Sequence, residues 1–355
     1  MCKDCKKEGD FLKFIHIADV HWGARPERDH TFGRIREQEI KETFQRVIDH
    51  ANEQQADLLL ISGDLFDQPP KQQDLREVDY LLSRLVQTRT VLIAGNHDHL
   101  KLQDAFSQYE WNSEVYVLDG KQRDRIYFED LETTVYGFSY WSSQITESLY
   151  DQMKPEEDDS FSILLAHGGD ESHIPIQKEA LKWSGFDYIA LGHIHKPEII
   201  FEDLMAYAGS LEPLDHTETG HHGLIEGEIS EEKKQITFVP FAKRMYTQVE
   251  VMISDQMSAL EIVDRVETEL SYRGRENLYE IVLTGSVDPQ IQPDFYEITS
   301  EYMITDIIYE TKNQWEYEQL SEEDDFIIQK VADILKDEPE ALRYAMEALT
   351  YAREN

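Results

Sequence analysis

The sequence predicts an α/β protein: a layered core of β-sheets flanked by helices, followed by a small α+β domain and C-terminal helices. Three observations lead to this fold class. Short runs of Ile, Leu and Val are typical of strands buried on both faces of a sheet. The segments between the first of these runs carry apolar residues at helical spacing. Beyond about residue 243, a strand-like alternation and an amphipathic helix replace this pattern.

The core elements follow from these patterns in chain order. Strands are expected over 11–17, 57–61, 90–93, 161–165 and 188–191. Helices are expected over 34–55 and, after the Pro69-Pro70 break, over 72–86. The alternation of strands and helices is that of a sheet covered by helices.

The same patterns divide the chain into four parts. Residues 1–10 are expected to be a polar, flexible tail, and their Cys2 and Cys5 have no second cysteine pair. Residues 11–244 form the main domain, and residues 245–315 a small α+β module. Residues 316–355 predict two amphipathic helices, which Asp337-Glu338-Pro339 separates. An apolar stripe on such helices indicates burial against their own domain or against a partner.

Five short motifs each follow one of the core strands. They are Asp19-Val20-His21, Gly63-Asp64, Gly95-Asn96-His97-Asp98, His167-Gly168 and Gly192-His193-Ile194-His195. In sheets covered by helices, functional groups gather on the loops that leave the carboxyl ends of the strands. These polar side chains are therefore expected to converge at one place.

The converging groups predict a metal site. With His97 set aside, they are two carboxylates, one amide oxygen and four imidazoles, which are too many ligands for one ion. Structural zinc favours thiolates, which this set lacks. Mixed nitrogen and oxygen ligands suit Mn, Fe, Zn and related ions. If one carboxylate is shared, the seven residues can hold two ions, the arrangement used for in-line phosphoryl displacement.

In order and in sequence, these motifs resemble the calcineurin-like metallophosphoesterase family, and within it the SbcD-like DNA repair exonucleases. The resemblance spans about residues 11–244. It includes the stretches Ile-Ala-Asp-Val-His-Trp-Gly, Ser-Gly-Asp-Leu-Phe-Asp-Gln-Pro-Pro, Ala-Gly-Asn-His-Asp and Tyr-Ala-Gly-Ser-Leu-Glu. It implies a metal-dependent phosphodiesterase that cleaves DNA as an exonuclease, with endonuclease activity left open.

The resemblance also implies a role for each residue. The first metal would be held by Asp19, His21, Asp64 and His195, and the second by Asp64, Asn96, His167 and His193. Both would be divalent, with Mn favoured over Fe, Co or Zn. His97 would be the general acid. Asp67 stands where archaeal and eukaryotic relatives have a second histidine, and it would orient His97 or assist proton transfer.

Substrate contacts are expected from Arg25, Gly209 and Ser210. Arg25 opens a run of arginines after the first motif, which either lines the approach to the site or is an ordinary solvated helix start. Gly209-Ser210 indicates a tight turn, and the resemblance adds contact with the substrate backbone.

The implied partners are DNA, a second copy of the chain and an SMC-like, SbcC-type ATPase that binds the C-terminal helices. The resemblance assigns the 245–315 module a capping role in selecting DNA. No run of 18 apolar residues exists, and the N-terminal segment is not a secretory signal, so a cytoplasmic location is expected.

The charge of the chain fits DNA binding poorly. Asp and Glu number 72 against 34 Lys and Arg, a net charge of −38. Proteins that grip DNA by themselves neutralise phosphates with basic residues. Two functions therefore remain open: a nuclease whose DNA affinity comes mostly from its partner, and a phosphoesterase for a small nucleotide or a phosphoprotein. A scaffold with an inactive site is disfavoured because every ligand position and His97 are present.

Overall fold

The computed structural model describes residues 11–121, 123–156, 161–288, 291–312, 326–335, 341 and 344–345. The chain divides into two compact units, residues 1–247 and residues 248–355, and each is described by itself. The predicted tail with Cys2 and Cys5 lies outside the described residues. So does most of the second predicted terminal helix.

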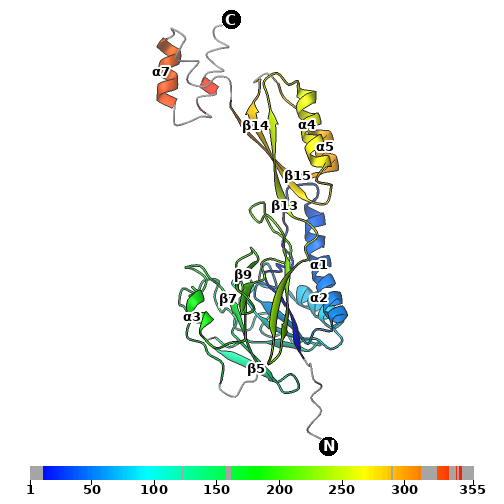
Figure 1. Cartoon of the computed structure of the whole chain (residues 1–355), viewed down its shortest axis with the longest axis vertical. Helices are drawn as coiled ribbons and strands as arrows, with labels where there is room; N and C mark the ends of the chain where they lie inside the picture. Colours follow the sequence, from blue (N-terminus) through cyan, green and yellow to red (C-terminus); the bar gives the residue numbers. More distant parts are fainter. Residues whose placement is uncertain are drawn as a thin grey trace, which may run out of the picture. The chain divides into compact units, whose positions relative to one another are not determined.

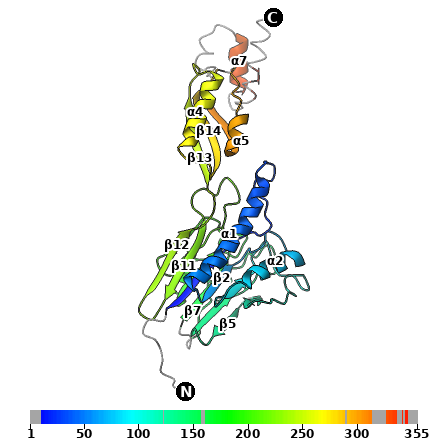
Figure 2. The same cartoon turned by 90° about the vertical axis from the view of Figure 1, so that its right-hand side faces the viewer.

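The first sheet of unit 1 has six strands in the order β12-β11-β1-β2-β3-β4. Its strands β12, β11 and β2 are labelled in Figure 2, and β5, β7 and β9 of the second sheet are labelled in Figure 1. Strands β1, β2, β3 and β4 run parallel, whereas β11 pairs with β1 in the antiparallel direction. The bounds are β1 Leu12–Ile17, β2 Leu58–Ser62, β3 Arg89–Ile93, β4 Val115–Val117, β11 Gly223–Ile229 and β12 Lys234–Pro240.

The second sheet of unit 1 also has six strands, in the order β5-β6-β7-β8-β10-β9. Its central strands β6, β7, β8 and β10 are parallel, and β5 and β9 are antiparallel edges. The bounds are β5 Asp124–Phe128, β6 Thr133–Gly137, β7 Phe161–His167, β8 Tyr188–Gly192, β9 Glu198–Phe201 and β10 Met205–Tyr207.

The two sheets pack face to face, and their central strands divide their side chains between the core shared by the two sheets and an outer core. On β2, Leu58 and Leu60 point into the core between the sheets. The alternate residues Leu59 and Ile61 point toward α1 (Gly33–Gln54) and α2 (Gln72–Leu82), which cover the first sheet (Figure 2). This period-2 alternation buries both faces of the strand. The predicted α/β fold class, with sheet layers flanked by helices, is confirmed.

Helix α2 ends four residues before the predicted boundary. The Ser83 hydroxyl donates to the Tyr80 carbonyl oxygen, and the backbone turns there. Val86, the last residue of the predicted helix, is 85% exposed. Leu85 still packs against the core, but from a turn in which its backbone N–H donates to the Leu82 carbonyl oxygen at 3.0 Å.

Unit 2 contains a three-stranded sheet in the order β13-β14-β15, with β14 and β15 parallel. The strands are β13 Tyr246–Ile253, which crosses the division between the units, β14 Leu278–Ser286 and β15 Met303–Lys312. The helices are α3 Lys178–Lys182 in unit 1 and α4 Ala259–Ser271, α5 Tyr296–Glu301 and α7 Phe326–Leu335 in unit 2. Ser258 and Glu261 form a capping box that starts α4. Ile262, Val266 and Leu270 of α4 are buried in the core of this α+β module.

A buried histidine on β1 makes the stability of unit 1 sensitive to acid. His16 is fully buried, with Nδ1 2.8 Å from the Tyr188 hydroxyl. Burial lowers the pKa of His16 from 6.5 to about 3. As pH falls through this window, the unfolded chain takes up a proton that the folded chain does not. The stabilisation is therefore complete above pH 6.5 and is lost progressively toward pH 3.

In a His16→Leu variant, the free energy of unfolding is expected to fall less between pH 6.5 and pH 4 than it does in the wild type. Urea unfolding at several pH values, in the presence of a chelator, measures this slope. A His216→Gln variant, which replaces an exposed histidine, is the control and should keep the wild-type slope. Equal slopes for the wild type and His16→Leu would contradict the assignment.

Candidate metal centre

The predicted ligands lie on loops at the carboxyl ends of five strands. The loops after β1, β2 and β3 and the ends of β7 and β8 carry, in chain order, Asp19, His21, Asp64, Asn96, His167, His193 and His195. Strands β1 to β3 are parallel, β7 and β8 are parallel, and β2 packs against both β7 and β8. The five ends therefore meet at one edge of the two-sheet core.

Four of these residues have a backbone conformation that is unusual for a non-glycine residue. The φ angles are 48° at Asp19, 49° at His21, 49° at Asp64 and 93° at His193. Each such left-handed residue is destabilising by about 1–3 kcal/mol and persists only where the surroundings enforce it. Strain of this kind clusters at functional sites, so its repetition at one strand edge points to a working site.

Glycines next to the ligands let the loops approach closely. A Cβ on Gly95 would lie 2.2 Å from Oδ1 of Asp64. A Cβ on Gly63 would lie 2.3 Å from Nδ1 of His167, and the φ of Gly63 is +92°. Any side chain at either position would separate Asp64 from His167. These two motifs therefore need glycine for steric reasons.

One group of ligand atoms is formed by Asp19, His21 and His195, whose donor atoms lie within 4.8 Å of one another. The Nε2 atoms of His21 and His195 are 3.1 Å apart. Two imidazole nitrogens this close must share a proton or a cation, because two lone pairs repel each other.

A second group is formed by Asp64, His167 and His193, again within 4.8 Å. The Asn96 side-chain oxygen lies 2.9 Å from Nε2 of His167 and 3.1 Å from Nδ1 of His193. Asn96 therefore belongs with this group.

Asp64 connects the two groups. Its Oδ2 lies 3.3 Å from Nε2 of His167 and 3.9 Å from Nε2 of His21. Its Oδ1 accepts the backbone N–H of His97 at 2.9 Å. The geometry suits a carboxylate shared between two ions.

The ionisable side chains at this edge of the core shift one another's pKa values. Burial disfavours ionisation of Asp64, but His167, His21 and His97 outweigh it and lower the pKa of this carboxyl group. Burial likewise disfavours protonation of His167, yet Asp64 and Asp19 raise its pKa to about 9. Burial and Asp64 raise the pKa of Asp98 to about 7. A divalent cation would compete with the protons held on these imidazoles.

The donor set fits divalent ions of intermediate hardness. Among the described residues, the two groups contain imidazole nitrogens and carboxylate and amide oxygens, with no thiolate. Cys2 and Cys5 lie outside the described residues. A closed tetrahedral zinc site of the structural kind does not match this set.

His97 and Asp67 lie beside the first ligand group. Nδ1 of His97 is 3.0 Å from the backbone oxygen of Asp67, and the Asp67 carboxylate is 3.3 Å from Nδ1 of His21. The rings of His97 and His21 meet edge to face at 4.8 Å. Since a carbonyl oxygen only accepts, His97 carries a proton on Nδ1, which leaves Nε2 for exchange with a substrate.

The three residues that were predicted to contact the substrate lie in different environments. The Arg25 guanidinium is mostly exposed and pairs with Glu37 at 3.2 Å. Gly209 has a φ of +75°, which fits the predicted turn. The Ser210 hydroxyl is fully buried and donates to Glu218 at 2.8 Å. The substrate contacts of Arg25, Gly209 and Ser210 remain predictions, and the Ser210 hydroxyl itself is bonded to Glu218 inside the protein.

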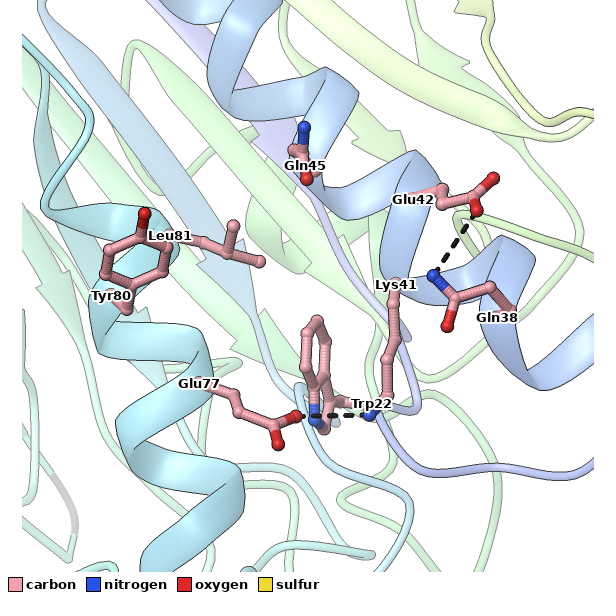
Figure 3. Close-up of a pocket in the computed structure, with 8 residues that line it drawn as sticks. All are labelled: Trp22, Gln38, Lys41, Glu42, Gln45, Glu77, Tyr80 and Leu81. Atoms are coloured by element: carbon pink, nitrogen blue, oxygen red, sulfur yellow. Dashed lines mark hydrogen bonds and ion pairs between the residues drawn. The ribbon is translucent and has the colours of Figure 1, made fainter.

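The loop that carries His21 is held in place by Trp22. The indole is buried, and Nζ of Lys41 lies 4.9 Å from the ring centroid. Lys41 also pairs with Glu77 at 3.1 Å, which links α1 to α2 above the ring (Figure 3). The hollow around these side chains has a volume of about 200 Å³, and no predicted ligand lines it. The hollow is therefore not part of the metal centre.

Three carboxylates at the site escaped the sequence analysis as functional residues. Asp98 accepts the backbone N–H groups of Gly95 and Phe66. Asp170 lies 2.8 Å from Nε2 of His193, and Glu218 lies 2.6 Å from Nδ1 of His195. Asp98 and Asp170 lie within three residues of a motif histidine, so their positions in the sequence could have identified them as candidates. Glu218 lies 23 residues from its partner His195, and no pattern in the sequence connects the two.

Comparison with known proteins decides the family. A model described as calcineurin-like phosphoesterase matches residues 12–197, just over half of the chain. The chain belongs to the calcineurin-like phosphoesterase family. As a member, it is a metal-dependent phosphodiester hydrolase, and the predicted family and enzyme class are confirmed. Divalent metals are the cofactors of this family, and the two ligand groups are its candidate sites here.

Several curated relatives in the family align over most of the chain. An uncharacterized metallophosphoesterase, YhaO of Bacillus subtilis, is 29% identical over 302 residues, which cover 78% of this chain and 72% of the relative. The DNA double-strand break repair protein Mre11 of Methanopyrus kandleri is 27% identical over 316 residues, with coverages of 81% and 67%. Mre11 of Methanocaldococcus jannaschii is 32% identical over 213 residues, or 57% of each chain. Among the described residues, no helix has the length and apolar character needed to cross a bilayer.

Proposed function

We propose that the chain is a Mn-dependent nuclease that hydrolyses DNA phosphodiesters in DNA repair, together with an SMC-like ATPase. The observation that carries the proposal is the pair of ligand groups joined by Asp64, with His97 beside them. The similarity to Mre11 proteins of double-strand break repair supports DNA as the substrate.

The proposed ligands for one ion are Asp19, His21, Asp64 and His195, and for the other Asp64, Asn96, His167 and His193. When bound, two divalent ions lower the pKa of a coordinated water and neutralise charge on the transferring phosphoryl group. Asp64 accepts the His97 backbone N–H, which ties the proton donor to the ligand loop. Asp67 orients the His97 ring through its carbonyl oxygen. His97 then delivers the proton on Nε2 to the leaving oxygen.

A second candidate function is hydrolysis of a small nucleotide or a phosphoprotein. The net charge of −38 favours it, because a duplex would be repelled at long range. The arginines after the first motif do not offset this charge. Arg25 pairs with Glu37 at 3.2 Å and Arg28 with Asp29 at 3.6 Å.

The nuclease proposal therefore includes a partner that supplies DNA affinity. The resemblance found in the sequence implies an SMC-like ATPase bound by residues 316–355, and a homodimer. Of this segment, the structure describes α7 and residues 341 and 344–345. Ile334 of α7 is 70% exposed within the described residues, which leaves apolar surface for a partner. The capping role of residues 245–315 is part of the same proposal.

The test is a Mn²⁺-dependent cleavage assay of the purified chain, with and without the ATPase. The substrates are linear duplex DNA, single-stranded DNA, a cyclic dinucleotide and a phosphopeptide, and His97→Ala is the control. We expect DNA to be degraded by the wild type, faster with the ATPase, and about 10²–10⁴-fold more slowly by the variant. Turnover of the small substrates with DNA untouched at low salt would instead establish the second candidate.

A further inference from the structure

Glu218 accepts a hydrogen bond from Nδ1, the second ring nitrogen of His195. Its Oε1 lies 2.6 Å from Nδ1 of His195, and its side chain is only 10% exposed. A carboxylate accepts hydrogen bonds, so the proton of His195 lies on Nδ1. This leaves the Nε2 lone pair free, and Nε2 is the atom that lies 3.1 Å from His21 in the first ligand group.

Glu218 is itself held by a chain of hydrogen bonds with one consistent direction. Nδ1 of His222 donates to Ser210, whose backbone oxygen lies at 3.1 Å and whose hydroxyl lies at 2.8 Å. The Ser210 hydroxyl donates to Oε2 of Glu218 at 2.8 Å, and the Leu214 backbone N–H donates to the same oxygen at 3.0 Å. His222 and Ser210 are both buried. The network therefore has one arrangement in which every donor meets an acceptor.

The same loop also holds the backbone of His195. The Ser210 backbone N–H donates to the His195 carbonyl oxygen at 2.9 Å. A Cβ on Gly209 would lie 2.6 Å from that oxygen, so glycine allows the approach. Residues 209–218 therefore form hydrogen bonds with both the carbonyl group and the ring of His195.

His167 is held by a buried partner, the Ser62 backbone oxygen at 2.8 Å from its Nδ1, whereas the carboxylates beside the other two ligand histidines are less buried than Glu218. Nδ1 of His21 is 3.3 Å from Asp67, whose side chain is 30% exposed. Nε2 of His193 is 2.8 Å from Asp170, which is 47% exposed and also binds His173. Exposed carboxylates exchange their hydrogen bonds with water, so they hold a ring less firmly than Glu218 does.

We propose that Glu218 is a positioning residue, which fixes the tautomer and the ring orientation of His195 through the buried Ser210 and His222 network. The proposal rests on the proposed role of His195 as a metal ligand. Carboxylates behind metal-binding histidines typically contribute about 10–100-fold to metal affinity. The loss of Glu218 should weaken the site that His195 serves and leave the other site unchanged.

The experiment compares Glu218→Ala, Glu218→Gln and wild type by Mn²⁺ titration calorimetry and by the visible absorption of the Co²⁺-loaded protein. Glu226→Gln is the matched control, because Glu226 makes a similar 2.6 Å contact with Nε2 of His50 away from the ligand groups. We expect about 10–100-fold weaker binding of one of two Mn²⁺ equivalents in Glu218→Ala, with a changed Co²⁺ spectrum. Glu218→Gln keeps an acceptor oxygen and should recover part of the affinity, and the control should match wild type.

Two results would overturn the proposal while leaving the proposed function intact. One is a folded Glu218→Ala variant with two wild-type Mn²⁺ affinities and an unchanged Co²⁺ spectrum. The other is an equal loss at both sites in Glu218→Ala and Glu218→Gln, which would indicate a general structural role. If Glu218→Ala does not fold, the glutamine variant decides, and wild-type behaviour there also overturns the proposal. Absence of Mn²⁺ binding by the wild type would instead contradict the proposed function.

Discussion

Replacing Asp64 with alanine is expected to remove both metal ions and to lower activity by more than about 10³-fold. The loss of a single electrostatic stabiliser already lowers turnover about 10²–10³-fold, and Asp64 serves both ligand groups. Its Oδ2 lies 3.3 Å from His167 and 3.9 Å from His21, and its Oδ1 accepts the His97 backbone N–H. Metal content per chain after dialysis, and hydrolysis of an aryl phosphodiester, measure the two effects.

Two further variants separate the loss of the bridge from a loss of structure. Asp64→Asn keeps the volume and one acceptor oxygen but removes the charge, so it should fold and still fail to retain two ions. Asp79→Asn removes a buried carboxylate that accepts bonds from Asn112 and Ser113 outside the site. This control should keep its metal content even if its unfolding free energy falls. Two full equivalents of Mn²⁺ in Asp64→Ala would show that the carboxylate is not shared.

Replacing His97 with alanine is expected to lower turnover by about 10²–10⁴-fold, the usual range for a general acid, without loss of metal. His97 is exposed, and its ring contacts the Asp67 carbonyl oxygen at 3.0 Å. Its Nε2 is thus free to reach a leaving oxygen. The loss should be large for DNA or an alkyl phosphodiester and small for an activated aryl phosphodiester, whose leaving group needs little protonation.

Steady-state kinetics with substrates of graded leaving-group pKa provide this comparison, with His50→Gln as a histidine variant remote from the site. Equal losses in His97→Ala for all leaving groups would rule out proton donation as the main role. A loss of metal in this variant would move His97 into the ligand set.

The sequence located the core elements closely because their signals are local. Apolar runs placed β1, β2 and β3 to within one residue at each end, and helical spacing placed α1 over 34–55 against Gly33–Gln54 in the structure. The predicted end of helix α2 came four residues too late because Leu85, which packs against the core from the turn after the helix, continues the helical spacing in the sequence. The pairing of strands was not readable from the sequence. Neither the antiparallel entry of β11 beside β1 nor the division into two sheets leaves a local pattern.

The sequence by itself determined the identity of the candidate ligands, because each one follows a strand and parallel strand ends meet. Only the tertiary structure decided how these ligands are supported. Glu218 and Asp170 each contact a ligand histidine, His195 and His193, that lies 23 residues away in the chain, and the Ser210 hydroxyl donates to Glu218 inside the protein. Such contacts depend on where loops fold back. A loop carboxylate in the sequence is the same whether it faces water or a buried imidazole, so only the fold distinguishes the two.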